Sequence, residues 1–569
     1  MRAESRRRVV AGLLMFGAGF ASADPPPPEI ASAFTPRPTA GGRHFMAVTA
    51  NPHATVAAVA VLRDGGSAVD AAIAAQMVLG VVEPQSSGIG GGGLMLHFDA
   101  RRQRLDAWDG RETAPRAAVD GPFRNAVGAP LAFRDAVRDP RAVGAPGLVA
   151  MLALAHRSAG RLPWARLFAP AIHLAEAGFP VSPRLHALLA WEGGFADPAA
   201  QALFFDAAGQ PWPVGHALRN PALADSLRRI AAQGPEALRR GVLADAMIDA
   251  LRAGLPADQA EALGLLGHGD LLAYAPQRRV ALCRPFRGYR VCGFPPPSSG
   301  ATTVLAMLGI WHALPGRVAP DSAGFVHRFA EVGRLAYADR AACVGDPAFH
   351  AVPVSALLDP RYLARRAALV GEDAGPRRTS GLDCAAEADE AERPSTSHLS
   401  IVDGAGNAVA LTSSIEDAFG NRRMAGGFLL NNQLTDFSTG GANRIAPGKR
   451  PRSAMAPTLV FDRRGALYAV LGSPGGSQIP NFVVQALLGL IEGGMTPAEI
   501  VAQPRFGNRN GATEVERGRL PPASIAALQA RGHLVRQVEM TSGVALVVRG
   551  GGRWIGAADP RREGQAAGE

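Results

Sequence analysis

Lysine is almost absent from this 569-residue chain, in which Lys449 is the only one. The formal net charge of +10 therefore comes from arginines, which are scattered along the sequence. Since no long basic run is interleaved with aromatic residues, a nucleic-acid partner is not expected. The sequence has no His-Glu-x-x-His motif and no Cys/His cluster with zinc-ligand spacing. We therefore expect neither a catalytic metal nor another cofactor.

Cysteine is also scarce, and four residues are too few for a disulfide scaffold. Cys283 and Cys292 flank a predicted strand-turn-strand segment, so a bond across this hairpin is compatible with an oxidising compartment. The sequence leaves open whether they are bridged. We interpret Cys343 and Cys384 as incidental.

Long apolar runs are confined to the N-terminus, where residues 9–20 form a modest apolar core. A basic segment precedes it and Ala21-Ser22-Ala23 follows it, which is the pattern of a signal peptide over residues 1–23. Residues 5–10 also fit a twin-arginine signal, and we leave the Sec and twin-arginine routes open. No other stretch has the roughly 18 apolar residues of a membrane span, so we expect a soluble periplasmic or secreted protein.

The first half of the chain is predominantly helical in pattern. Residues 52–63 are predicted to form one helix and residues 68–82 a second, which Ser67 and Asp70 begin with a capping-box arrangement. Residues 147–275 are mostly amphipathic helix. We find no catalytic pattern in that helical region.

A glycine run at residues 88–93 formally matches a dinucleotide-binding fingerprint. That fingerprint leaves a strand and enters a helix, whereas this run leaves a helix and enters a predicted strand at residues 94–98. We interpret the glycines as a tight passage that permits close backbone approach. Arg111 follows in a loop, where it is either a carboxylate-binding guanidinium or an ordinary surface arginine.

The second half alternates short strands with helices. Strands are predicted at residues 399–402, 408–411, 428–430, 459–461 and 469–471, and helices at 301–312, 322–338, from about 480, and 520–532. Because helices accompany strands in both halves, the sequence indicates a layered α/β fold.

Thr396 stands where a polar loop, residues 371–393, enters an apolar strand. Most threonines in strands are structural. Cleavage before Thr396, however, would place a hydroxyl and a new α-amine on one residue. An α-amine has a pKa near ~8 and can act as base for its own hydroxyl, which is a known form of nucleophilic catalysis.

Two further motifs have both a structural and a functional interpretation. Gly475 and Gly476 lie between a strand and a helix N-terminus, where backbone amides can stabilise developing negative charge; a plain αβ turn is the alternative. Ser298 and Ser299 follow a proline-rich turn without a nucleophile elbow, and we interpret them as cap and turn residues.

Together these motifs resemble the γ-glutamyltransferase (γ-glutamyltranspeptidase) family of N-terminal-nucleophile hydrolases, over about residues 42–561. The matching pieces include the segment from Asn51-Pro52 to Pro84 and the glycine run from Gly88. The others are Arg111-Glu112-Thr113-Ala114-Pro115, Pro296-Pro297-Ser298-Ser299-Gly300, Thr396-Ser397-His398, Leu430-Asn431-Asn432-Gln433, Asp436-Phe437-Ser438, Lys449-Arg450-Pro451, Gly472-Ser473-Pro474-Gly475-Gly476 and Gly556-Ala557-Ala558-Asp559-Pro560-Arg561.

The resemblance implies a four-layer αββα fold and self-cleavage between Ser395 and Thr396. This would leave a large subunit, residues 24–395, and a small subunit, residues 396–569, of 174 residues (569 − 395). The two fragments would form a heterodimer without a covalent link.

The resemblance also implies a role for each matching residue. The nucleophile would be Thr396, with its freed amine as base and Ser414 supporting that amine. Gly475 and Gly476 would form the oxyanion hole. The implied substrate-binding residues are Arg111 and Ser453 for the glutamyl α-carboxylate, Gln433 and Asp436 for its α-amine, and Glu416 by position.

The sequence departs from the family pattern in the substrate-binding region. Glu416 stands where many members have asparagine, and its charge would repel a substrate carboxylate unless it is turned away or paired, for instance with Arg452. Ala454 replaces the second serine of a usual pair. Ser438 and Ser453 are only 15 positions apart (453 − 438), too few for the lid loop of many members.

Three hypotheses follow. The first is an exported enzyme that cleaves γ-glutamyl amides such as glutathione and passes the acyl group to water, an amino acid or a peptide. The second is a glutaryl-type amidase, similar to the cephalosporin acylases of the family, in which Asp436 matters less. The third is a non-catalytic homologue, which the presence of Thr396 and both glycines disfavours.

Overall fold

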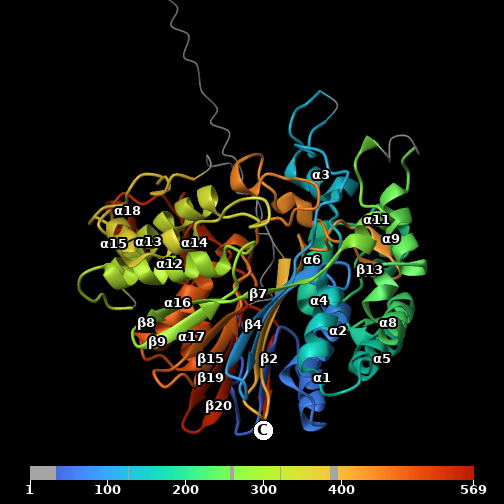
Figure 1. Cartoon of the computed structure of the whole chain (residues 1–569), viewed down its shortest axis with the longest axis horizontal. Coiled ribbons are helices and arrows are strands. Elements are labelled where there is room, and N and C mark those ends of the chain that lie inside the picture. The colour runs from blue at the N-terminus through green and yellow to red at the C-terminus, as the bar shows by residue number, and fades with distance from the viewer. Residues whose placement is uncertain (1–33, 126, 257–261, 321, 385–394) are drawn as a thin grey trace, which may run out of the picture.

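The computed structural model describes residues 34–125, 127–256, 262–320, 322–384 and 395–569, so the expected signal peptide lies outside the described residues. Two seven-stranded sheets pack face to face, and helices cover both outer faces (Figure 1). This αββα arrangement confirms the predicted fold class. Among the described residues, no helix combines the length and apolar character needed to cross a membrane.

The first sheet is antiparallel throughout and takes four of its seven strands from the chain after position 396. In spatial order its strands are β1 (Ala40–Gly42), β20 (Arg553–Ala558), β19 (Ala545–Gly550), β15 (Leu467–Gly472), β14 (Thr458–Phe461), β9 (Tyr289–Gly293) and β8 (Leu282–Phe286).

The second sheet is also antiparallel and contains the strand that begins with Ser395 and Thr396. Its order is β21 (Gln565–Gly568), β2 (Met46–Thr49), β10 (Ser395–Val402), β11 (Ala408–Glu416), β3 (Gly92–Asp99), β4 (Arg104–Gly110) and β7 (Gln277–Val280). Both sheets combine strands from before and after position 396, so each sheet needs both parts of the chain.

Helices from the N-terminal half cover the second sheet on the right of Figure 1. They include α1 (Pro52–Arg63), α2 (Ala68–Val82), α4 (Leu148–Ala159), α5 (Ala169–Ala177), α8 (Pro221–Gln233) and α9 (Val242–Arg252). Short helices α3 (Phe133–Arg138), α6 (Pro183–Glu192), α7 (Pro198–Phe204) and α11 (His268–Ala273) and strands β5 (Phe179–Pro180) and β6 (Ala217–Leu218) complete this half.

The opposite outer layer combines helices from both halves of the chain (Figure 1). It contains α12 (Gly300–Ala313), α13 (Ala323–Cys343), α14 (Val354–Leu357), α15 (Pro360–Ala367), α16 (Ile479–Ile491), α17 (Pro497–Ala502) and α18 (Pro522–Ala530). A small sheet of β16 (Phe506–Asn508), β17 (Thr513–Glu516) and β18 (Val535–Val538) adjoins it, and β12 (Met424–Ala425) pairs separately with β13 (Phe428–Leu429).

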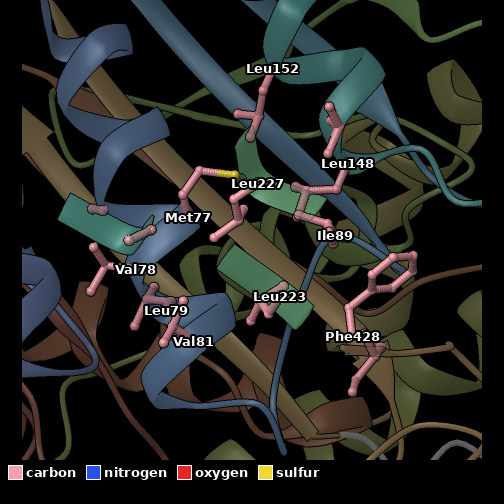
Figure 2. Close-up of a cluster of buried hydrophobic side chains, with 14 of the residues drawn as sticks. Met77, Val78, Leu79, Val81, Ile89, Leu148, Leu152, Leu223, Leu227 and Phe428 are labelled. Atoms are coloured by element: carbon pink, nitrogen blue, oxygen red, sulfur yellow. The ribbon is translucent and has the colours of Figure 1, made fainter. Parts of the chain in front are cut away.

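The nearly uniform burial of α2 follows from its small apolar residues, as the sequence predicts. Ser67 and Asp70 form the predicted capping box at its start. Figure 2 shows side chains of this helix, among them Met77, within the apolar cluster that joins the helical layer to the second sheet. The same cluster includes Leu399 of β10, so the strand that begins with Ser395 is anchored by core packing.

The glycine run 88–93 leads from α2 into β3, as predicted. A Cβ on Gly91 would lie 2.2 Å from the backbone oxygen of Ser414, and one on Gly90 would lie 2.3 Å from that of Leu429. Only glycine therefore permits the backbones to approach so closely at these two positions.

All four cysteines are in disulfides. The Cys283–Cys292 bond crosses the β8–β9 hairpin that the sequence indicates. The interpretation of Cys343 and Cys384 as incidental is wrong, because these two are also bonded. Their separation of 41 positions and the irregular chain before Cys384 hide this proximity from local sequence patterns.

Candidate active site

Thr396 is the second residue of β10 and is 1% exposed. It pairs with Ser414 of β11, and the register shifts between Ser395 and Thr396, so the regular ladder is interrupted at this peptide bond. The backbone oxygen of Thr396 accepts a hydrogen bond from Arg562 Nη1 at 3.2 Å. The predicted cleavage point is therefore buried and held at an irregularity in the central sheet.

Ser414 contacts the carbonyl group of that peptide bond. Its Oγ donates to the backbone oxygen of Ser395 at 2.6 Å and accepts from the backbone amide of Glu416 at 2.9 Å. Ser395 Oγ donates in turn to the backbone oxygen of Gln85 at 2.8 Å. A hydroxyl donor at the Ser395 oxygen is placed to stabilise negative charge that develops there.

Arg111 lies at the end of β4 and is 1% exposed, so it is not a surface arginine. Its Nη2 donates to Asp436 Oδ2 and, at 2.7 Å, to the backbone oxygen of Arg452; its Nε donates to that of Pro451 at 3.1 Å. The guanidinium is thus fixed by the segment that leads to Ser453.

Asp436 accepts a second hydrogen bond on the same oxygen, from Gln433 Nε2 at 2.7 Å. Both residues belong to one 3-10 turn, Gln433–Asp436, and the Asn443 side-chain amide donates to the Asp436 backbone oxygen at 2.7 Å. One cation, one anion and one amide therefore form a buried cluster.

Glu112, next in sequence to Arg111, is fully buried, and neither carboxylate oxygen has a hydrogen-bond partner among the described residues. Its Oε2 lies 3.6 Å from Arg111 Nη1. Burial outweighs this nearby cation and raises the pKa of Glu112 to about 8. Asp436 is therefore the carboxylate that accepts a hydrogen bond from Arg111 directly.

Ser453 is positioned by two serines that the sequence interpretation treats as cap and turn residues. The hydroxyl of Ser299 donates to the backbone oxygen of Ser453 at 2.7 Å, and Ser298 Oγ donates to that of Met455 at 2.7 Å. Ser299 is at the N-cap of α12, but its side chain makes no capping bond. Ser299 therefore occupies the predicted cap position, but its hydroxyl holds the Ser453 segment instead of a helix amide.

Gly475 and Gly476 connect β15 to α16 with φ angles of +124° and +63°. A Cβ at Gly475 would lie 2.5 Å from Cε2 of Phe482, so both the conformation and the available space require glycine. The turn brings Gly476 to the cavity that Thr396 lines. This placement allows backbone amides near the predicted nucleophile.

Glu416 is fully buried, has a φ of +80°, and accepts a hydrogen bond from the Asn432 side-chain amide. Burial and the neighbouring Asp436 and Asp417 carboxylates raise its pKa well above the ordinary glutamate value. The Glu416 carboxyl therefore binds its proton more tightly than an exposed glutamate does. A raised pKa reduces the repulsion between Glu416 and a substrate carboxylate. The sequence suggests Arg452 as the partner of Glu416, but in the structure its hydrogen-bond partner is Asn432.

His398, two residues after Thr396, is also buried. Its Nδ1 lies 2.8 Å from Thr412 Oγ1 and its Nε2 lies 3.1 Å from Ser400 Oγ. Burial lowers the pKa of His398 to about 3, so the ring is neutral and its contacts are structural.

The predicted site residues converge on one small cavity of about 20 Å³. Its lining comprises Arg111, Thr396, Ser414, Gln433, Asp436, Ser453, Ala454, Met455, Gly476 and Ile479. Gly475 and Glu416 adjoin this group without lining the cavity. Within the described residues, no His, Cys, Asp or Glu side chains are grouped so as to hold a metal ion.

Known proteins are similar to this chain over nearly its whole length. Residues 54–569 match the model of a family described as Gamma-glutamyltranspeptidase. The chain is 34% identical to the glutathione hydrolase proenzyme of Escherichia coli (strain K12), covering 98% of this chain and 97% of that protein. It is 35% identical to the acylase ACY 1 proenzyme of Pseudomonas sp. (strain V22), covering 95% and 96%.

Among solved structures, the cephalosporin acylase of Bacillus halodurans superposes with a TM-score of 0.82 at 28% identity, covering 94% of this chain and 97% of that one. The γ-glutamyltranspeptidase of Pseudomonas nitroreducens, solved with L-DON, superposes with a TM-score of 0.50 at 32% identity, covering 57% and 94%. A glutathione hydrolase, a γ-glutamyltranspeptidase and two acylases are therefore all similar to this chain.

Proposed function

Because the chain belongs to the γ-glutamyltranspeptidase family, we propose that it is a self-processing enzyme that cleaves γ-glutamyl amides such as glutathione. The observation that carries the proposal is the cluster of Arg111, Asp436 and Gln433 in the same cavity as Thr396. A γ-glutamyl head group carries an α-carboxylate and an α-ammonium group. A guanidinium and a carboxylate side by side match those two charges.

Self-processing begins with attack of Thr396 Oγ on the carbonyl carbon of Ser395. The hydrogen bond from Ser414 Oγ to the Ser395 oxygen supports this step, since it stabilises the oxyanion of the tetrahedral intermediate. Collapse breaks the Ser395–Thr396 C–N bond and leaves an ester on Thr396 and a free α-amine. Water then hydrolyses the ester, releasing the carboxyl group of Ser395 and the free hydroxyl of Thr396.

Turnover repeats this chemistry on a substrate. The Thr396 hydroxyl attacks the γ-carbonyl group, its proton passes to the residue's own α-amine, and the leaving amine takes up a proton as the γ-glutamyl ester forms. Backbone amides at Gly475 and Gly476 would stabilise the oxyanion. Water, or the amine of an amino acid or peptide, then takes the acyl group and regenerates the hydroxyl.

The working form would be a heterodimer of residues 24–395 and 396–569. Shared sheets support this proposal, since β10 and β11 lie between β2 and β3. We also infer export to the periplasm or the medium by a Sec or twin-arginine signal in residues 1–23. The two cysteine pairs fit an oxidising compartment.

A glutaryl-type amidase is the second candidate function. It is favoured by the similarity to two acylases. It is also favoured by Glu416, which stands where many family members have asparagine. A glutaryl group has no α-amine and would use Arg111 without needing Asp436.

Rates with γ-glutamyl-p-nitroanilide and glutaryl-p-nitroanilide distinguish the two candidates. We expect kcat/KM to favour the γ-glutamyl anilide by at least about tenfold, and Asp436→Asn to remove most of this preference, since a charged hydrogen bond contributes roughly 1.5–3 kcal/mol. Equal rates that Asp436→Asn leaves unchanged would overturn the γ-glutamyl assignment.

A further inference from the structure

A second and much larger cavity, of about 520 Å³, lies in the outer helical layer on the side of the first sheet. Its walls come from α12, α13, the C-terminal end of α16, and the segment from residue 519 into α18. None of its lining residues lines the Thr396 cavity. Its volume is within the range of small-molecule sites, roughly 300–1,000 Å³.

The body of this cavity is apolar and aromatic. Trp311 of α12, Phe325 of α13 and Phe506 of β16 contribute aromatic rings, and the Phe325 ring contacts each of the other two edge to face. Leu488 and Leu520 also contribute to the apolar lining and are themselves buried. Such a lining favours an apolar ligand body over a fully hydrated ion.

The charged side chains that line the cavity are mostly positive. Four arginines line it but only one carboxylate does, that of Glu492. Glu492 accepts from Arg287 Nε at 2.6 Å and from Trp311 Nε1 at 3.1 Å. It is therefore engaged with one of the four guanidinium groups, and three positive charges are left without a carboxylate in the lining.

Within the described part of the chain, two of those three guanidinium groups donate hydrogen bonds only to backbone carbonyls. Each also lies over an aromatic ring, which for Arg519 is that of Phe34 at 3.8 Å. Arg328 donates to Gly316 and Pro315 at 3.0 and 2.9 Å and lies over the Trp311 ring. Arg519 Nη2 donates to the backbone oxygen of Ala502 at 2.8 Å. The Arg519 Nε is buried and has no hydrogen-bond partner among the described residues.

The third guanidinium group belongs to Arg317, on the exposed loop between α12 and α13. No hydrogen bond or ion pair joins Arg317 to another described residue. An unneutralised guanidinium at the rim complements an anionic head group.

We propose that this cavity binds a small amphipathic carboxylate, with its apolar body against Trp311 and Phe506 and its head group at Arg317 and Arg519. A medium-chain fatty acid has this chemistry. A buried guanidinium N–H without a partner gains a charged hydrogen bond when a carboxylate binds. The site is separate from the Thr396 cavity, and the proposal does not depend on the substrate of that cavity.

Calorimetric titration of the purified, processed enzyme with monomeric dodecanoate tests this proposal, with dodecyltrimethylammonium as the charge-reversed probe. We expect one saturable dodecanoate site per enzyme and at least about tenfold weaker binding of the cation. Arg519→Gln should weaken dodecanoate binding about tenfold or more, by loss of a charged hydrogen bond. Ser524→Trp, which places an indole at the rim of the cavity, should abolish it.

Arg252→Gln, at an exposed arginine in the last turn of α9, is the matched control and should leave dodecanoate affinity unchanged. Turnover of the anilide substrate should be near wild type in all three variants, which verifies their folding. The proposal is overturned if the wild-type enzyme shows no saturable dodecanoate binding, or if both probes bind equally. Binding that neither Arg519→Gln nor Ser524→Trp alters would also overturn it.

Discussion

Arg111 and Asp436 form a buried ion pair in the cavity that Thr396 also lines. The two residues are 325 positions apart, and the fold brings them together at the ends of β4 and of the 3-10 turn Gln433–Asp436. A zwitterionic head group can replace this pair by two new ones, its carboxylate with Arg111 and its ammonium group with Asp436. A substrate with only a carboxylate satisfies only Arg111.

Arg111→Lys should weaken donor binding, because an ammonium group cannot reproduce the planar, multiple donation of the guanidinium. We expect KM for γ-glutamyl-p-nitroanilide to rise about 100-fold, which corresponds to roughly 2.7 kcal/mol, with a smaller change in kcat. Arg116→Lys, at an exposed arginine five positions later, is the control. An unchanged KM for Arg111→Lys would show that Arg111 does not bind the donor.

Ser414→Ala should slow self-cleavage, because it removes the hydroxyl that donates to the Ser395 oxygen. A loss of about 10²- to 10³-fold is expected for one oxyanion donor, measured as the time course of fragment appearance on a denaturing gel. Ser414→Thr retains the hydroxyl and should cleave.

Ser413→Ala provides the matched control for Ser414, because the adjacent Ser413 hydroxyl donates to Gln76 Oε1 instead. It should cleave at the wild-type rate. If Ser414→Ala also cleaves at the wild-type rate, the hydroxyl does not assist cleavage.

Glu83 should make the folded protein less stable as the pH rises. Burial raises the pKa of Glu83 from 4.5 to about 7, so between these values the folded chain holds a proton that the unfolded chain has lost. The contribution of Glu83 to the free energy of unfolding is fully present below pH 4.5. It falls by about 3 kcal/mol as the pH rises through 7.

Glu83→Gln should therefore flatten the decline of Tm between pH 4.5 and 7, measured by thermal unfolding at several pH values. Glu372→Gln, at an exposed glutamate, should keep the wild-type profile. A profile for Glu83→Gln that parallels the wild type would refute this assignment.

Both disulfides join residues within the proposed large fragment, Cys283 to Cys292 and Cys343 to Cys384. The two fragments should therefore separate on a denaturing gel without reductant, and added reductant should release no further fragment. In native buffer they should co-elute, because the shared sheets hold them together. Fragments that separate only after reduction would contradict the proposed noncovalent heterodimer.

Local sequence signals predict the elements that meet at the site. The capping box at Ser67, the β10–β11 hairpin and the passage from β15 into α16 all depend on neighbouring residues, and all are present. The predicted helix at residues 322–338 is present but extends to Cys343, because its last turn is covered by packing that periodicity alone does not reveal.

Contacts between distant segments are the part that sequence patterns miss. The bond from Ser299 to the Ser453 segment spans 154 positions, and the bond from Asn432 to Glu416 depends on how two loops fold together. The Cys343–Cys384 bond is of the same kind. A search for hydroxyl or amide side chains beside the predicted site motifs would have selected Ser299 and Asn432 for attention, but not their partners.

The most direct test of self-processing is intact mass measurement with N-terminal sequencing of the purified protein. The account predicts two chains, the smaller comprising 174 residues (569 − 395) and beginning at Thr396, and a single uncleaved, inactive chain for Thr396→Ala. A wild-type protein that turns over substrate as one uncleaved chain, or that is cut at another bond, would contradict it.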